Sequence, residues 1–156
     1  MSVNGKELLS FLRRVPENVI VVLDEAYCEF ARVRKDYPDS LALLKQFSNL
    51  IVTRTFSKAY GLAGLRVGYS VSSPDIANAL NKVREPFNVN LLAQEAAGAA
   101  LDDRAHLTKT VRTVNEGRKF LMAGLEKMGL RCVDTVTNFI LFDLKRPAQP
   151  VYEALL

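Results

Sequence analysis

Two short aliphatic runs, each followed by polar residues, constrain the fold of this chain more than any other feature. Val19 to Leu23 is unbroken and stops at Asp24-Glu25, and Leu50 to Thr53 is the second run. Short runs rich in β-branched residues are typical of strands that are buried on both faces of a sheet. A third strand is predicted at 67–71. Because helical patterns alternate with these runs, the first hundred residues are predicted to form a largely parallel α/β sheet.

Residues that favour helix starts divide the rest of this region. Asn4 and Glu7 have the spacing of a capping box ahead of an N-terminal helix. Ser73-Pro74-Asp75 combines a capping serine, a proline in the first turn and an acid, which predicts a second helix. The alanine-rich segment Asn90 to Asp102 is predicted to be helical as well.

The last third of the chain is predicted to leave this sheet. From Leu107 to Met128, apolar residues recur every three or four positions, with Arg118 in the one slot that lacks an apolar residue, which predicts one long amphipathic helix closed by Gly129. Asn138 to Leu144 is a further strand candidate, and prolines near the C-terminus open another helix. We therefore predict two units, at 1–105 and 106–156. The second unit is expected to be truncated, because the chain stops inside a helix.

Composition narrows the classes of function. The net charge is +4 and the basic residues are scattered, so no nucleic-acid partner is predicted. No apolar run approaches the roughly 18 residues of a membrane span, and no signal pattern opens the chain. Cys28 and Cys132 form no metal or disulfide motif, which favours a reduced, cytoplasmic protein. His106 is the only histidine, and it is expected to be a structural or surface residue.

The glycine-rich segment Thr55 to Tyr69, TFSKAYGLAGLRVGY, carries the strongest chemical signal. A lysine in such a turn can form a Schiff base with a carbonyl cofactor, and Lys58 is placed for this. Arg66 offers the planar two-pronged donor that grips a phosphate, and the hydroxyls of Ser57 and Thr55 suit phosphate oxygens. An amine and a guanidinium together indicate pyridoxal phosphate. The glycine spacing matches neither a dinucleotide fingerprint nor a Walker loop.

Polar residues after the first strand complete the candidate site. Asp24 and Lys58 both follow strand ends, where ligands gather in open α/β sheets. The carboxylate of Asp24 is placed to hold a pyridine nitrogen protonated, and the hydroxyl of Tyr27 to bind the phenolic oxygen of the cofactor. The alternatives are that Asp24 only caps the next segment, and that the ring of Tyr27 packs in the core with its hydroxyl at the edge of the core. Glu25 is expected to be a solvated neighbour.

Four stretches of the chain resemble fold-type I, class I/II pyridoxal-phosphate aminotransferases, and most of all the histidinol-phosphate aminotransferases. They are Asp24 to Phe30, Thr55 to Tyr69, 84–90 and 137–142. The resemblance implies part of the large, mainly parallel-sheet domain of such a transferase, followed by a long helix and the start of the small α/β domain. It also implies a homodimeric parent that acts on amino-acid and keto-acid substrates.

The resemblance also implies roles for single residues. Lys58 would bind the cofactor covalently and move a proton, and no metal is implied. The cofactor would be held by Asp24, Tyr27, Thr55, Ser57, Lys58 and Arg66. The reaction of these relatives transfers an amino group between glutamate and imidazole-acetol phosphate, in histidine biosynthesis. Their Asn-Pro-Thr-Gly-type loop and carboxylate-binding arginine have no counterpart in this sequence, so the chain by itself is expected to be inactive.

Two alternatives stay open on the sequence alone. One is a related pyridoxal-phosphate enzyme, either another class I/II aminotransferase or a threonine-phosphate decarboxylase, because these share much of the pattern. The other is a non-catalytic interaction domain that kept the fold and lost the chemistry. Retention of Asp24, Lys58 and Arg66 as a set favours an active parent.

Overall fold

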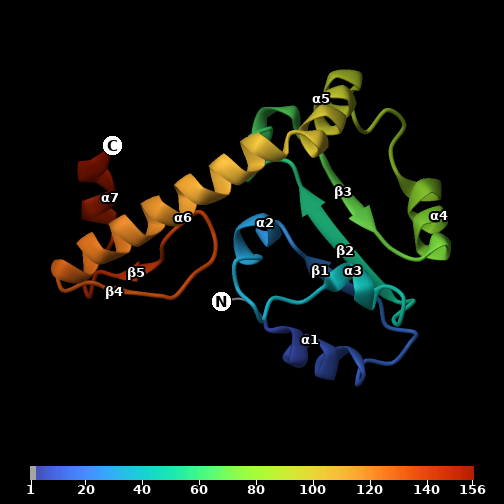
Figure 1. The fold of residues 1–156 in the computed structure, drawn as a ribbon, viewed down its shortest axis with the longest axis horizontal. Helices are drawn as coiled ribbons and strands as arrows, with labels where there is room; N and C mark the ends of the chain where they lie inside the picture. Colours follow the sequence, from blue (N-terminus) through green and yellow to red (C-terminus); the bar gives the residue numbers. More distant parts are fainter. Residues whose placement is uncertain (1–2) are drawn as a thin grey trace.

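The computed structural model describes residues 3–156, and it places two sheets at the two ends of a long helix (Figure 1). The larger sheet contains β1 (Val21–Asp24), β2 (Leu50–Thr55) and β3 (Gly68–Val71), with β2 in the centre. The smaller sheet pairs β4 (Arg131–Cys132) with β5 (Phe142–Asp143). The chain is therefore mixed α/β, as the sequence predicts.

Strand direction in the larger sheet only partly follows the expectation of a largely parallel sheet. β1 and β2 are parallel, with Asp24 opposite Thr53. β3 runs antiparallel to β2, with Gly68 opposite Thr55. The connection between β2 and β3 contains only a short 3-10 helix, Ala63–Leu65. A parallel return usually runs through an α-helix that packs on one face of the sheet, and residues 56–67 contain no α-helix, so the chain turns back beside β2 instead.

The helices begin where local capping chemistry predicts. Asn4 Oδ1 accepts a hydrogen bond from the backbone N–H of Glu7 at 2.9 Å, and Asn90 Oδ1 accepts one from Ala93 at 2.9 Å. Ser73 precedes a helix whose first residue is proline, although its side chain makes no capping hydrogen bond. The helices are α1 (Gly5–Leu12), α2 (Cys28–Ala31), α3 (Ser40–Leu43), α4 (Pro74–Val83), α5 (Leu91–Asp102), α6 (Arg104–Lys127) and α7 (Gln149–Leu155).

Two separate apolar clusters support the larger sheet. In the first, Leu8 and Leu12 of α1 pack against Leu50 and Val52 of β2. In the second, Phe56 and Val67 pack against two small residues of α5, Ala93 and Ala97. The second cluster lies directly under the segment that joins β2 to β3, so this segment has a core of its own.

The long helix α6 joins the two sheets and closes at Gly129, which has a left-handed φ of 77°. The strand expected at 138–144 is confined to β5. Just before it, Thr137 Oγ1 hydrogen-bonds Thr135 Oγ1 (2.8 Å) and the Phe139 carbonyl (3.1 Å), local side-chain bonds of the kind that favour turns over a strand ladder. The division at 1–105 and 106–156 stays a prediction. Within residues 3–156, no helix combines the length and apolarity that crossing a bilayer requires.

Candidate functional site

The register of the larger sheet brings the predicted site segments to one edge. β1 ends at Asp24 and β2 ends at Thr55, and because these strands are parallel, both ends lie at the same side. β3 starts at this side, since Gly68 is opposite Thr55. Arg66 precedes β3 by two residues. Three chain segments that are distant in sequence therefore meet outside the carboxyl ends of β1 and β2, where open α/β sheets bind ligands.

Lys58 lies in a tight turn just after β2. The backbone N–H of Ser57 donates to Thr55 Oγ1 at 3.1 Å, and the N–H of Gly61 donates to the Lys58 carbonyl at 3.1 Å. Phe56 and Ala59, on either side of the turn, are buried. The turn backbone is therefore fixed from inside by packing and from outside by hydrogen bonds, while the side chains of Ser57 and Lys58 remain partly exposed.

The Lys58 amine lies over an aromatic ring from the other strand end. Its Nζ is 5.5 Å from the ring centroid of Tyr27, which is within the range of a cation–π contact. The edge of the same ring is met by Phe139, with 5.7 Å between centroids and 75° between planes. Tyr27 thus contacts Lys58 and a residue that follows α6, and the latter contact was not predicted from the sequence.

Asp24 is exposed and faces away from the α1 core. Val21 and Leu23 pack toward that core, so strand alternation turns Val22 and Asp24 to the other face of the sheet. Asp24 Oδ1 accepts a hydrogen bond from the N–H of Ala26 at 3.0 Å, which shapes the turn toward Tyr27. A cavity of about 200 Å³ touches Asp24 and Tyr27, but its walls include Leu8 and Leu23 of the α1 side, and Lys58 is not among its lining residues.

Arg66 lies at the same edge, and its side chain bonds locally. It is exposed, and its Nη1 donates to the carbonyl of Ala63 at 2.9 Å. Among residues 3–156, no hydrogen bond joins it to Lys58, Ser57 or Asp24. Its φ of 55° is left-handed, a conformation that a non-glycine residue holds only at a cost of about 1–2 kcal/mol. Phe87 and Lys145, outside the candidate site, have the same left-handed backbone, with φ of 57° and 52°.

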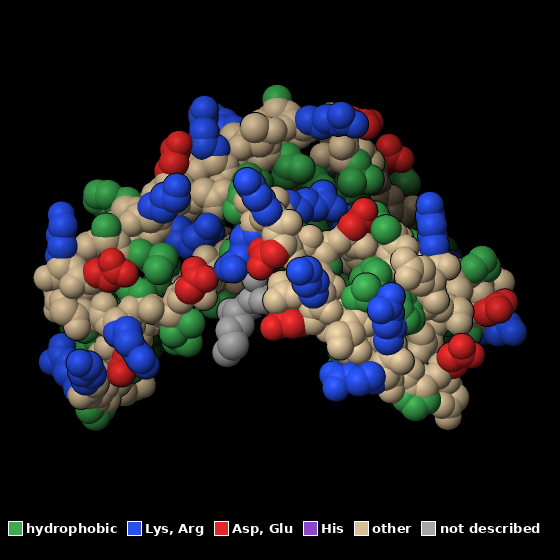
Figure 2. All heavy atoms as spheres, turned by 60° about the horizontal axis from the view of Figure 1, so that its bottom comes forward, with side chains coloured by type: hydrophobic (Ala, Val, Ile, Leu, Met, Phe, Trp, Pro, Cys, Tyr) green, Lys and Arg blue, Asp and Glu red, His purple; other side chains and the backbone are tan. Residues whose placement is uncertain are grey.

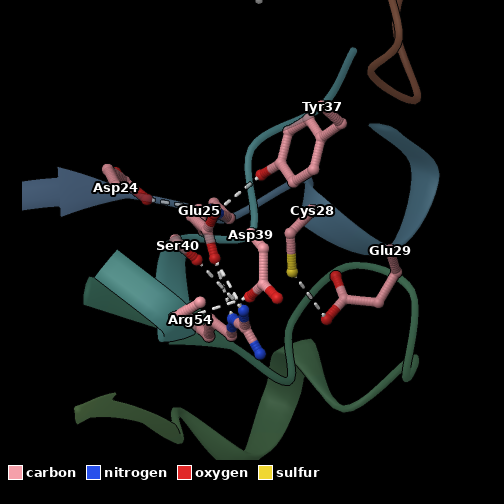
Figure 3. Close-up of polar contacts among 10 residues, drawn as sticks. Asp24, Glu25, Cys28, Glu29, Tyr37, Asp39, Ser40 and Arg54 are labelled. Carbon is pink, nitrogen blue, oxygen red and sulfur yellow. Dashed lines mark hydrogen bonds and ion pairs between the residues drawn. The ribbon is translucent and has the colours of Figure 1, made fainter. Parts of the chain in front are cut away.

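Glu25 is buried, so the expectation of a solvated neighbour is wrong. It is 3% exposed. Arg54 Nε and Nη2 donate to its Oε2 at 3.0 and 2.8 Å, and Tyr37 Oη donates to its Oε1 at 3.0 Å (Figure 3). Burial, together with the negative charge of Glu25, raises the pKa of Tyr37. The sequence offers one signal for this network, an acid after the first aliphatic run and an arginine within the next strand.

Cys28 is a second buried polar group close to the site. Its Sγ lies 3.1 Å from Glu29 Oε1, and only 1% of the residue is exposed (Figure 3). Burial, and then the negative charge and hydrogen bond of Glu29, raise the pKa of the Cys28 thiol to about 12. The thiol is therefore held in its neutral form under ordinary conditions.

His106, at the start of α6, reaches the lysine segment although it is far away in sequence. A Cβ atom placed at Gly61 would lie 3.9 Å from His106 Nε2. His106 itself is exposed and within 3.4 Å of the Thr110 hydroxyl.

On the face drawn in Figure 2, lysines and arginines are interspersed with acids. No basic stripe stands out in this view.

Together these features define an α/β protein with a lysine-centred polar site outside the carboxyl ends of its parallel strands. The family model for aminotransferase class I and II matches residues 2–156, and the chain belongs to this family.

Relatives and solved structures agree with this assignment. The chain is 56% identical to histidinol-phosphate aminotransferase 2 of Methylococcus capsulatus over 96% of its own length and 40% of that protein. It superposes on histidinol-phosphate aminotransferase of Sinorhizobium meliloti, solved in complex with pyridoxal-5'-phosphate, with a TM-score of 0.86, at 36% identity over 95% of this chain and 40% of that one. It also superposes on the L-threonine-O-3-phosphate decarboxylase of Porphyromonas gingivalis with a TM-score of 0.78. Sequence identity there is 29%, over 93% of this chain and 44% of that one. The chain thus spans about 40% of the length of the curated relatives it matches.

Proposed function

We propose that this chain is the cofactor-lysine part of a pyridoxal-phosphate aminotransferase, acting between glutamate and imidazole-acetol phosphate in histidine biosynthesis. The observation that carries the proposal is the Lys58 amine, held 5.5 Å from the Tyr27 ring centroid at the edge where Asp24 ends β1. Relatives named for the histidinol-phosphate reaction support the choice of substrate.

The chemistry of the side chains fits pyridoxal phosphate group by group. The cofactor has an aldehyde, a pyridine nitrogen, a phenolic oxygen and a phosphate. Lys58 supplies an amine for the aldehyde, Asp24 a carboxylate for the nitrogen and Tyr27 a hydroxyl for the phenolic oxygen. Arg66 and Ser57, with Thr55 beside it, supply a cation and hydroxyls for the phosphate. When bound, this cofactor supplies an electron sink for the substrate carbon that loses its proton.

Each side chain then has a defined task. Lys58 would hold the cofactor and, as a free amine, would move a proton to or from the substrate carbon. Asp24 would keep the pyridine nitrogen protonated through its negative charge. The fixed turn around Lys58 restricts the positions that its amine can reach. Proton transfer at a defined atom requires such positioning.

The histidinol-phosphate branch is favoured over the alternatives. Curated relatives named for that activity are 49–56% identical to the chain. Among the solved structures, the histidinol-phosphate aminotransferase of Sinorhizobium meliloti is 36% identical and the threonine-phosphate decarboxylase 29%. Asp24, Lys58 and Arg66 are all retained, which argues against a non-catalytic interaction domain. Both cysteines are free thiols, in keeping with a reducing, cytoplasmic compartment.

We further propose that the 156-residue chain alone does not transaminate. It matches only about 40% of the length of its relatives, and large apolar side chains lie open to solvent, including Phe87 at 96% and Val22 at 60% exposure. Surfaces of this kind are normally covered by further protein, which also fits a homodimeric parent. Any measured transaminase turnover by this polypeptide alone would contradict this part of the proposal.

The test of the main proposal is selective labelling. Pyridoxal phosphate is added, the mixture is reduced with borohydride, and the modified peptides are mapped. We expect the label mainly at Lys58, and Lys58→Ala should remove it. Lys82→Ala, at an exposed position of α4, is the matched control and should leave it unchanged. A label spread evenly over the lysines would overturn the assignment.

A further inference from the structure

A buried ion pair links the ends of the two parallel strands beneath the proposed site. The side chains of Glu25 and Arg54 are 2% and 8% exposed. Both donating nitrogens of Arg54 point at Glu25 Oε2, while Tyr37 donates to the other oxygen (Figure 3). Each carboxylate oxygen of Glu25 thus has its own partner, Arg54 or Tyr37. Because the guanidinium is planar, its two bonds fix the orientation of the Glu25 carboxylate as well as its distance from Arg54.

The position of this pair in the chain indicates its role. Glu25 lies in the turn between Asp24 and Tyr27, and its backbone N–H donates to the Thr53 carbonyl at 2.9 Å. Arg54 is followed directly by Thr55, at the end of β2 that leads into the Lys58 turn. One ion pair therefore bridges the two chain segments that carry the proposed cofactor groups.

We propose that Glu25, Arg54 and Tyr37 form a clamp that positions the Asp24–Tyr27 turn against the Thr55–Lys58 turn. The clamp rests on the proposed function, because these two turns carry the groups that would hold the cofactor. Its members are positioning residues, since they lie on the α1 side of the sheet, opposite Asp24. A buried ion pair contributes little net stability compared with apolar residues of similar volume. Directional bonding between the turns is what an apolar replacement cannot supply.

The test replaces the clamp without leaving a lone buried charge. Glu25→Leu combined with Arg54→Met removes both charges at similar volume, and Tyr37→Phe removes one hydrogen bond. Leu12→Ala, in the α1 core away from the clamp, is the control for a general loss of stability. Each variant is labelled with pyridoxal phosphate and borohydride, and amide hydrogen exchange is measured at residues 24–28 and 55–58.

The two measurements separate positioning from stability. We expect the double variant to need at least about tenfold more pyridoxal phosphate for equal labelling of Lys58. Its amides at 24–28 and 55–58 should also exchange faster. Tyr37→Phe should show a smaller change of the same kind, and Leu12→Ala should keep selective labelling at Lys58. Wild-type labelling and wild-type exchange in the double variant would overturn the clamp.

Failure of the proposed function has a different signature. If pyridoxal phosphate and borohydride label the lysines of the wild-type chain evenly, the cofactor assignment is wrong. Hydrogen exchange then still tests whether the clamp links the two turns. Faster exchange in both turns of the double variant, with slow exchange there in Leu12→Ala, would then support it as a link between strand ends. Unchanged exchange would refute it.

Discussion

The buried thiol of Cys28 makes stability depend on pH in a way that can be calculated. The pKa of this thiol rises from an ordinary 9.0 to about 12 in the folded chain. Between these values the folded state keeps the proton that the unfolded state has lost. A folded pKa above the unfolded one gives stability that is complete below pH 9 and is lost as the pH rises. We therefore expect unfolding to become easier in alkaline solution.

The size of this effect follows from the two pKa values. Above pH 9 the contribution changes by about 1.4 kcal/mol per pH unit, which amounts to roughly 2 kcal/mol at pH 10.5. Tyr37 adds a contribution of the same sign above pH 10, because its pKa is raised as well. The difference between wild type and Cys28→Ala isolates the thiol, since Tyr37 titrates in both.

Urea unfolding followed by circular dichroism between pH 8 and 10.5 measures this difference. Wild type should lose about 2 kcal/mol more than Cys28→Ala over this range. Cys132→Ala, at the partly exposed second cysteine, is the matched control and should follow wild type. Equal pH dependence in wild type and Cys28→Ala would show that the surroundings of Cys28 do not hold its proton.

Two further predictions concern close contacts around the site. Gly68→Ala would place a Cβ 2.7 Å from the Arg54 carbonyl oxygen. We therefore expect the free energy of unfolding, measured in urea, to fall by about 1–3 kcal/mol. Gly64→Ala is the control and should change it little, because no atom lies within 4 Å of the added Cβ. Equal effects would refute the close approach of β2 and β3. For the rings of Tyr27 and Phe139, a double-mutant cycle with leucine should give a coupling of about 0.5–1.5 kcal/mol, and strict additivity would argue against their contact.

Local chemistry made much of the fold predictable from the sequence. The capping box at Asn4 and the left-handed Gly129 depend on residues within one helical turn, so the pattern suffices. The runs that predicted β1 and β2 overlap the observed strands, because short β-branched runs between polar residues have few other solutions. The direction of β3 was missed, because it depends on the path of the connection and not on the strand residues.

The candidate site shows the same division. Strand ends follow from the aliphatic runs, so the positions of Asp24 at the end of β1 and of Lys58 just after β2 could be anticipated, while their roles stay predictions. The burial of Glu25 could not be anticipated from the sequence, because its partner Arg54 is 29 residues away. Their pairing becomes visible only when β1 and β2 are neighbours. Tyr27 meets Phe139 for a comparable reason, since over a hundred residues separate them.

The two sides of the proposed site are held by different parts of the molecule. The Lys58 turn rests on the cluster of Phe56 and Ala97, which belongs to the lysine segment and α5. The Tyr27 ring is instead reached by Phe139, from the part of the chain beyond α6. A shift of that part would change the packing of Phe139 on the ring that lies under the Lys58 amine. The same motion would also reach the lysine segment through His106 of α6, which lies close to Gly61, so α6 and the residues after it border the site at two points.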